Sequence, residues 1–151
     1  MNIFLIGYRC SGKTSVGKAL SKELRLAFVD ADQRLIEIER KTIAELVDIK
    51  GWDYFRQQEK AIMQSICTRD GQVVATGGGV VLNPDNVAAM KNSGWLIWLR
   101  ANSETIRKRM LLDNLTAGQR PALTSQGAEN EIESILKDRT PYYPVSYTHL
   151  R

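Results

Sequence analysis

The feature that most constrains this chain is a glycine-rich turn near its start, between an apolar run and a helical pattern. Residues 3–6 are apolar and predict a short buried strand, which Gly7 ends. Gly7, Gly12, Lys13 and Thr14 follow the spacing Gly-x4-Gly-Lys-Thr, which is typical of a phosphate-binding loop. In such a loop, backbone N–H groups point at phosphate oxygens, and the next helix turns its positive N-terminal end toward the same anion. The motif therefore predicts a nucleotide site.

The same motif predicts individual roles. Lys13 is expected to reach the β- and γ-phosphates, and Thr14 to place its hydroxyl on Mg²⁺. We assign nucleotide binding to six consecutive residues: Cys10, Ser11, Gly12, Lys13, Thr14 and Ser15. A helix is expected to follow at once, and four apolar residues share one of its faces: Val16, Ala19, Leu20 and Leu24.

Length and composition narrow the class of protein. The 151 residues suffice for one domain with a real core, and 43% hydrophobic with 25% charged residues is ordinary for a globular protein. The net charge of +4 suits ATP as well as nucleic acid, but the positive residues are dispersed, so we expect no nucleic-acid partner. No apolar run reaches bilayer length and no signal segment is recognisable, so we expect no membrane association. Two cysteines make no disulfide framework, which fits a reducing cytoplasm.

A pair of carboxylates follows the second expected strand, residues 26–29. Asp30 and Asp32 come at its C-terminal end, where ligands bind in an open α/β sheet. One of them can hold Mg²⁺, directly or through water, and the other can accept a hydrogen bond or a proton from a substrate hydroxyl. The structural alternative is a helix N-cap, because Asp is favoured there and a helix is expected to begin here.

Two short helical segments and a longer helix are expected next. Thr42 followed by Glu45 predicts a capping box, and Gly51 interrupts the helical pattern. The longer helix starts at Trp52, and its apolar face holds Phe55, Ile62, Met63 and Ile66.

Arg56 and Glu59 lie three residues apart on that helix and can pair. Such a pair can orient the guanidinium for a bidentate grip on a carboxylate. The alternative is a solvated surface pair of little energetic weight, and spacing alone does not decide between them.

Three consecutive glycines follow the third expected strand, residues 72–75. Gly77, Gly78 and Gly79 allow the backbone to approach a ligand closely, the alternative being a flexible loop. A helix is expected to enter at Asn83-Pro84. The fourth strand, residues 95–99, is apolar throughout, which predicts a parallel sheet covered on both faces by helices.

The last third of the chain carries a polar stretch at about residues 112–124, which we interpret as a lid. Ser103 is expected to cap the helix before it. Within the lid, Arg120 can stabilise charge on a transferring phosphoryl group, the alternative being a solvated arginine. Residues 127–138 predict a final helix.

Together these pieces resemble the shikimate kinase family, whose P-loop fold is that of the nucleoside-monophosphate kinases. Six motifs carry the resemblance: Gly7-x4-Gly-Lys-Thr14, Phe28-Val-Asp-Ala-Asp32, Gly51-x3-Phe55-Arg56-x2-Glu59, Ala75-Thr-Gly-Gly-Gly79, Arg120-Pro-x-Leu-Thr124 and Arg139-x-Pro-x-Tyr143. The resemblance implies one three-layer α/β/α kinase domain over residues 1–143. It also implies transfer of the γ-phosphoryl group of ATP to the 3-hydroxyl of shikimate, with Mg²⁺, in the biosynthesis of aromatic amino acids.

The resemblance further implies roles for the substrate residues. Asp32 would hold the shikimate hydroxyls and act as base, while Arg56 and Arg139 would clamp the carboxylate. Glu59 would brace Arg56, and the backbone around Gly78 would line the pocket.

It implies roles on the nucleotide side as well. Asp30 would support Mg²⁺ together with Thr14. Lys13 and Arg120 would stabilise the phosphoryl group in flight, and Arg109 would pack on adenine. We expect ATP, ADP and shikimate as partners of a monomeric protein.

Beyond Tyr143 the resemblance stops. The family continues into a fifth strand and a final helix, whereas this sequence reads Pro-Val-Ser-Tyr-Thr-His-Leu-Arg over residues 144–151. We therefore expect that strand and helix to be missing, residues 144–151 to be a short non-native or disordered tail, and residues 95–99 to form an edge strand.

Two alternative functions stay open. One is another P-loop kinase of small metabolites, such as a gluconate kinase, against which the paired Arg56 and Arg139 and the three glycines argue. The other is a truncated fragment that binds nucleotide without turnover.

Overall fold

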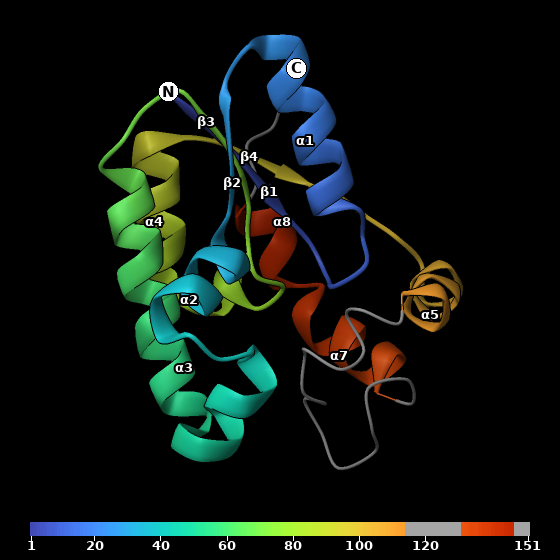
Figure 1. Cartoon of the computed structure of the whole chain (residues 1–151). Helices are drawn as coiled ribbons and strands as arrows, with labels where there is room; N and C mark the ends of the chain where they lie inside the picture. The colour runs from blue at the N-terminus through green and yellow to red at the C-terminus, as the bar shows by residue number, and fades with distance from the viewer. Residues whose placement is uncertain (114–130, 147–151) are drawn as a thin grey trace.

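A parallel β-sheet runs through the middle of the molecule (Figure 1). The computed structural model describes residues 1–113 and 131–146. In that part of the chain the sheet has the strand order β2-β3-β1-β4. The strands are β1 (Asn2–Ile6), β2 (Ala27–Asp30), β3 (Gln72–Ala75) and β4 (Gly94–Trp98). The helices are α1 (Lys13–Leu24), α2 (Ala31–Glu39), α3 (Ile43–Cys67), the 3₁₀ turn η1 (Val80–Leu82), α4 (Pro84–Ser93), α5 (Ser103–Leu112), α7 (Ile132–Arg139) and α8 (Tyr142–Ser146).

Helices lie on both sides of the sheet, which confirms the expected three-layer arrangement. Helix α1 lies on one side, and α3 and α4 lie on the other with α2 beside α3 (Figure 1). Each strand runs parallel to its neighbours, and Phe4 at the centre of β1 is in register with Val74 of β3 and Leu96 of β4. All carboxyl ends therefore meet at one edge, which is where a ligand site is expected.

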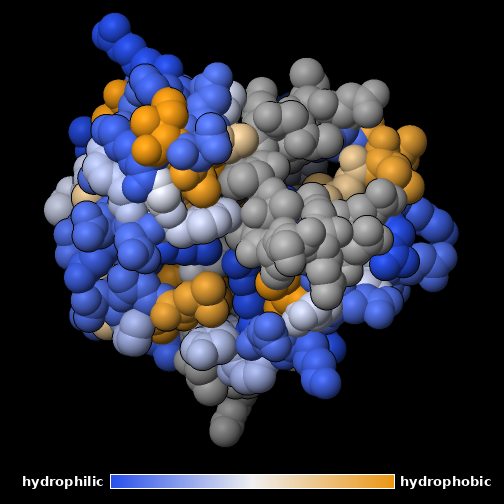
Figure 2. Space-filling model, turned by 90° about the horizontal axis from the view of Figure 1, so that it is seen from below, coloured by the Kyte–Doolittle hydropathy of each residue, from blue (hydrophilic) through white to orange (hydrophobic). Residues whose placement is uncertain are grey.

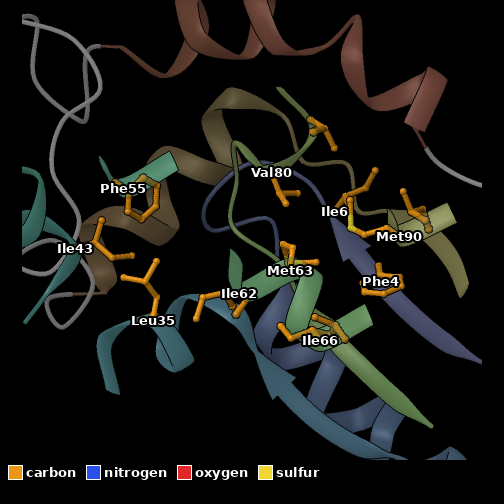
Figure 3. Close-up of a cluster of buried hydrophobic side chains, with 14 of the residues drawn as sticks. Phe4, Ile6, Leu35, Ile43, Phe55, Ile62, Met63, Ile66, Val80 and Met90 are labelled. Carbon is orange, nitrogen blue, oxygen red and sulfur yellow. The ribbon is translucent and has the colours of Figure 1, made fainter. Parts of the chain in front are cut away.

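The largest core cluster fills the space between the sheet and α3 (Figure 3). Phe4 and Ile6 of β1 pack there with Met63 and Ile66 of α3 and Met90 of α4, and all five are fully buried. Burying a side chain of this size contributes about 1.5–3 kcal/mol. The four apolar residues predicted for the inner face of α3 are all buried, as expected.

The start and the interruption of α3 follow the sequence closely. Thr42 Oγ1 accepts a hydrogen bond from Glu45 N at 3.2 Å, and Glu45 Oε2 accepts one from Thr42 N at 2.8 Å. This is the predicted capping box. Gly51, with φ of 84°, breaks the helical backbone between the two segments of α3.

The apolar face predicted for α1 is not its buried face. Val16 and Leu24 are exposed, whereas Gly17 and Ser21 are buried. The helix lies too close to the sheet for larger residues, because an added Cβ at Gly17 would lie 2.6 Å from Cε2 of Phe28. Close packing of small residues against the sheet thus overrides the hydrophobic periodicity.

Strand β4 is less covered than its sequence predicts. Leu96 is fully buried, but the other residues of the strand are partly exposed. In the described residues β4 pairs only with β1 and lies at the end of the strand order, as expected for an edge strand.

Two helix starts in the last third differ from expectation. Asn102, not Ser103, caps α5, because its side chain accepts a hydrogen bond from Thr105 N at 2.8 Å. Helix α7 begins at Ile132 in the described part of the chain, and α8 includes the first three residues of the predicted tail.

None of the helices in residues 1–113 and 131–146 is long and apolar enough to cross a bilayer. On the face shown in Figure 2, hydrophobic residues form separate patches among hydrophilic ones.

Candidate active site

The phosphate-binding loop connects β1 to α1 and presents the start of that helix to a cleft. Gly12 is the N-cap of α1 in a left-handed conformation with φ of 101°. Within the described residues no side chain caps α1, and its first turn holds no acidic residue. The first N–H groups of a helix have no intrahelical partner, so this terminus suits an anion.

Lys13 lies at the centre of the loop. Its Nζ donates hydrogen bonds to the carbonyl oxygens of Gly7 at 2.7 Å and Tyr8 at 2.8 Å, and the side chain is buried. The lysine therefore holds the loop closed and places its own positive charge inside it. That charge lies where the motif requires one for phosphate.

The cleft beside the loop has a volume of about 610 Å³. All six predicted nucleotide-binding residues from Cys10 to Ser15 line it, together with Val16, Asp30, Ala75, Thr76, Arg109, Leu112 and Asp113. Arg109 reaches the cleft from α5, and its Nη1 donates to the carbonyl oxygen of Cys10 at 2.9 Å. The structure thus brings the predicted adenine residue to the loop across a long sequence separation.

Asp30 caps a helix, one of the two roles predicted for it, and it also contacts Thr14. Its Oδ1 accepts a hydrogen bond from Gln33 N at 3.1 Å and so caps α2, while Oδ2 accepts one from Thr14 Oγ1 at 3.2 Å. A hydroxyl and a carboxylate side by side at a phosphate cleft fit Mg²⁺, which prefers oxygen ligands and keeps several waters.

A second cavity, of about 50 Å³, lies beside the loop. It is lined by residues from five separate segments of the chain: Arg9, Asp32, Ile43, Trp52, Phe55, Arg56, Glu59, Gly77, Gly78, Gly79 and Arg139. Asp30 lines the first space and Asp32 the second, so the end of β2 serves both. A substrate in the cavity would lie next to a nucleotide in the cleft.

Arg56 and Glu59 form the predicted pair inside this cavity rather than on the surface. Arg56 Nη1 donates to Glu59 Oε1 at 2.8 Å, and the Glu59 side chain is only 6% exposed. Burial raises the pKa of Glu59, and the charge of Arg56 opposes that rise. The guanidinium lies over the rings of Trp52 and Phe55. The pair is therefore pre-oriented, as a bidentate carboxylate site requires.

At two of the three glycines, charged side chains occupy the space that a Cβ would need. An added Cβ at Gly77 would lie 2.6 Å from Glu59 Oε2, and one at Gly79 would lie 2.5 Å from Arg56 Nη2. The glycines therefore let the backbone come close to charged groups of the protein itself.

Arg139, at the end of α7, is buried in the same cavity. Its Cζ lies 5.8 Å from the centre of the Tyr8 ring. Burial lowers the pKa of Arg139, and the nearby charge of Arg56 lowers it further. Arg139 and Arg56 thus share one cavity, an arrangement that a bound carboxylate would stabilise.

Comparison with known proteins assigns this arrangement to a family. The sequence model of the shikimate kinase family matches residues 9–150. A shikimate kinase of Syntrophus aciditrophicus is 39% identical over 152 residues, covering 95% of this chain and 78% of the relative. A shikimate kinase 2 of Yersinia pestis is 42% identical over 141 residues, covering 93% and 80%. The chain belongs to the shikimate kinase family.

A solved structure supports the same assignment at the level of the fold. The shikimate kinase from Acinetobacter baumannii in complex with shikimate superposes with a TM-score of 0.89 at 28% identity. The match covers 99% of this chain and 83% of that one. The chain is accordingly a kinase with the P-loop kinase fold, and the reaction of its family is the ATP-dependent phosphorylation of shikimate.

Sequence reasoning missed one charged residue of this shikimate kinase-family site. Arg9 is buried and lines the second cavity from within the phosphate loop. Its position between the two motif glycines is variable in the pattern, so no spacing identified it. The presence of an arginine at a loop position next to a nucleotide was the one available signal.

One predicted site residue cannot be placed. Arg120 and the predicted lid, apart from Leu112 and Asp113, lie outside the described residues. Their roles stay predictions.

Proposed function

We propose that this enzyme transfers the γ-phosphoryl group of ATP to the 3-hydroxyl of shikimate, giving shikimate 3-phosphate and ADP. The observation that carries the proposal is the convergence of Arg56, Arg139 and Asp32 on one cavity beside the phosphate-binding cleft. Arg56, Arg139 and Asp32 in one cavity match a ring that bears a carboxylate and hydroxyl groups.

The substrate carboxylate is received by Arg56 and Arg139. A planar guanidinium binds a carboxylate through two parallel hydrogen bonds, and Glu59 holds Arg56 in place for this contact. Gly78 lies beside Arg139 and lets the backbone line the same side of the cavity.

Asp32 holds the substrate hydroxyls and accepts the proton of the one that attacks. It lines the cavity while Asp30, two residues away, lines the cleft, so the acceptor hydroxyl faces the nucleotide. The protein's main contribution is to position the two reactants for in-line transfer and to stabilise charge.

The nucleotide is held by the loop from Cys10 to Ser15, with Arg109 packed on adenine. Lys13 stabilises the phosphoryl group in transfer, joined by Arg120 of the predicted lid. Thr14 and Asp30 hold Mg²⁺, and this ion neutralises charge on the phosphate oxygens when bound.

The enzyme works as a monomer in the cytoplasm, with ATP, ADP and shikimate as its partners. Cys10 and Cys67 are both free thiols, which is in keeping with a reducing compartment.

The test is ADP production by the 151-residue chain from ATP and Mg²⁺, with shikimate, with gluconate and without either. Turnover that depends on shikimate and stops on addition of EDTA is expected. Turnover with gluconate instead would favour the alternative kinase. No ADP production with either acceptor, together with a melting temperature that rises with Mg-ATP, would identify a nucleotide-binding fragment without turnover.

A further inference from the structure

Tyr143 connects parts of the substrate cavity that lie far apart in the sequence. It belongs to α8, its side chain is 1% exposed, and its ring stacks on Trp98 of β4 at a centroid distance of 5.4 Å and an angle of 19°. This packing fixes the ring against the sheet. The position of its hydroxyl is therefore set by the fold.

The hydroxyl binds the backbone of the cavity and lies close to its cation. Tyr143 Oη donates a hydrogen bond to the carbonyl oxygen of Gly78 at 2.9 Å. Because a carbonyl only accepts, the phenol proton points to Gly78. The positive charge of Arg139 acts on the same hydroxyl.

These two partners are adjacent parts of the predicted carboxylate site. An added Cβ at Gly78 would lie 3.5 Å from Arg139 Nη1, so the backbone and the guanidinium face one another. The Tyr8 ring lies on Arg139 as well. Without the Tyr143 hydroxyl, the half-buried Gly78 carbonyl would lose its hydrogen-bond donor and Arg139 would lose a polar neighbour.

We propose that Tyr143 is a positioning residue that sets the geometry of Arg139 and of the Gly78 backbone for the carboxylate of the substrate. This inference rests on the proposed function and deepens it. Tyr143 lines neither the cleft nor the cavity, so it acts through its two partners. It should therefore govern shikimate affinity and leave nucleotide affinity unchanged.

The protonation state of the hydroxyl suits this role. Burial raises the pKa of Tyr143 to about 12, against the partial opposition of the Arg139 charge. The phenol therefore keeps its proton, and its bond to Gly78, throughout the pH range in which a kinase is assayed.

The experiment compares Tyr143→Phe with Tyr142→Phe, in which the neighbouring, half-exposed tyrosine loses the same atom. Loss of a buried hydrogen bond that leaves a polar group unsatisfied costs about 1–3 kcal/mol, which corresponds to a roughly 5- to 150-fold change. We expect a rise of that order in the KM and Kd for shikimate in Tyr143→Phe. The KM for ATP should stay within about twofold, and Tyr142→Phe should behave as wild type.

A second measurement separates positioning from general loosening of the core. The Kd of shikimate and of its uncharged methyl ester is measured by calorimetry, which needs no turnover. We expect Tyr143→Phe to weaken shikimate binding and to leave the ester unaffected, and its effect to vanish when Arg139 is already Ala. Equal weakening of both ligands, an additive double-mutant cycle, or a variant without a cooperative melt would each overturn the proposal.

The outcomes also distinguish the two levels of inference. Wild-type binding of shikimate without turnover would contradict the proposed function and still allow the role of Tyr143 to be decided by the Kd values. No binding of shikimate by the wild type would overturn both.

Discussion

The cleft beside the phosphate-binding loop and the cavity that contains Arg56 and Arg139 are neighbours that the chain builds in opposite ways. The cleft is formed mainly by one continuous segment, residues 10–16, and its chemistry comes from backbone N–H groups and one lysine. The cavity is formed by five segments between Arg9 and Arg139, and its chemistry comes from charged side chains. The cleft therefore depends mainly on local sequence, and the cavity depends on tertiary packing.

This difference decides how each region tolerates change. In the cleft, Thr14 and Asp30 are in contact with solvent, so their interactions are screened. In the cavity, Glu59 and Arg139 are buried, and each depends on the charges around it. The effects of substitutions in the cavity should therefore depend on one another. The same substitutions should leave the affinity of the cleft for nucleotide unchanged.

The largest effect is expected from Asp32→Asn, which removes the proposed base. We expect kcat to fall by about 10²–10⁴, the usual contribution of general base catalysis. The affinity for ATP should persist, because Asp32 lines the cavity and not the cleft. Steady-state kinetics and nucleotide titration measure the two quantities. The matched control is Asp53→Asn, an exposed aspartate of α3; substantial remaining activity in Asp32→Asn would remove Asp32 as base.

Glycine substitutions on the two sides should separate the two regions. Gly79→Ala places a methyl group 2.5 Å from Arg56 Nη2, so the guanidinium must move. We expect the KM for shikimate to rise about tenfold or more, equivalent to at least ~1.4 kcal/mol. Gly12→Ala strains a left-handed residue with φ of 101° and should instead raise the KM for ATP. Equal changes in both constants for either variant would show that the two regions are not independent.

The buried carboxyl of Glu59 should make stability depend on pH. Its pKa is raised in the folded protein, so its contribution to stability is fully present below its ordinary value of 4.5 and is lost as pH rises through the folded pKa. We expect wild type to lose stability relative to Glu59→Gln as pH rises above about 4.5. Urea unfolding of both proteins between pH 4 and 8 measures this, with the exposed Glu37→Gln as control for the loss of one charge. A constant difference would contradict the prediction.

The smallest effect is expected from Lys60→Ala, which breaks an ion pair outside both regions. Lys60 Nζ lies 2.6 Å from Asp85 Oδ2 on the surface between α3 and α4. Exposed pairs contribute at most ~1 kcal/mol, so the melting temperature should fall slightly and both KM values should stay unchanged. A raised KM for shikimate would show that the position of α3 on the sheet is transmitted to Arg56.

Local patterns in the sequence predicted much of the fold and of the site. The capping box at Thr42, the interruption at Gly51 and the loop from Gly7 to Thr14 depend on residues a few positions apart, so their geometry follows from the sequence. The pairing of Arg56 with Glu59 was predicted for the same reason. Its burial was not, because burial depends on Gly77 and Gly79, which come from another part of the chain.

Other expectations failed where tertiary packing outweighed local preference. The apolar face of α1 is exposed at Val16 and Leu24, because the small Gly17 allows the helix to approach the sheet closely. The N-cap of α5 moved by one residue to Asn102, whose side chain is the one that reaches Thr105 N. No spacing pattern placed Arg9 in the cavity, because its position there depends on which elements surround the loop.

The sequence by itself determined the phosphate-binding loop and the parallel α/β architecture. These follow from periodicity and from short-range spacing, which act along the chain. The tertiary structure alone decided that Arg9, Asp32, Arg56 and Arg139 share a cavity and that Tyr143 binds Gly78 beside Arg139. Such contacts join residues up to 130 positions apart, from Arg9 to Arg139, and only the packing of helices on the sheet brings them together.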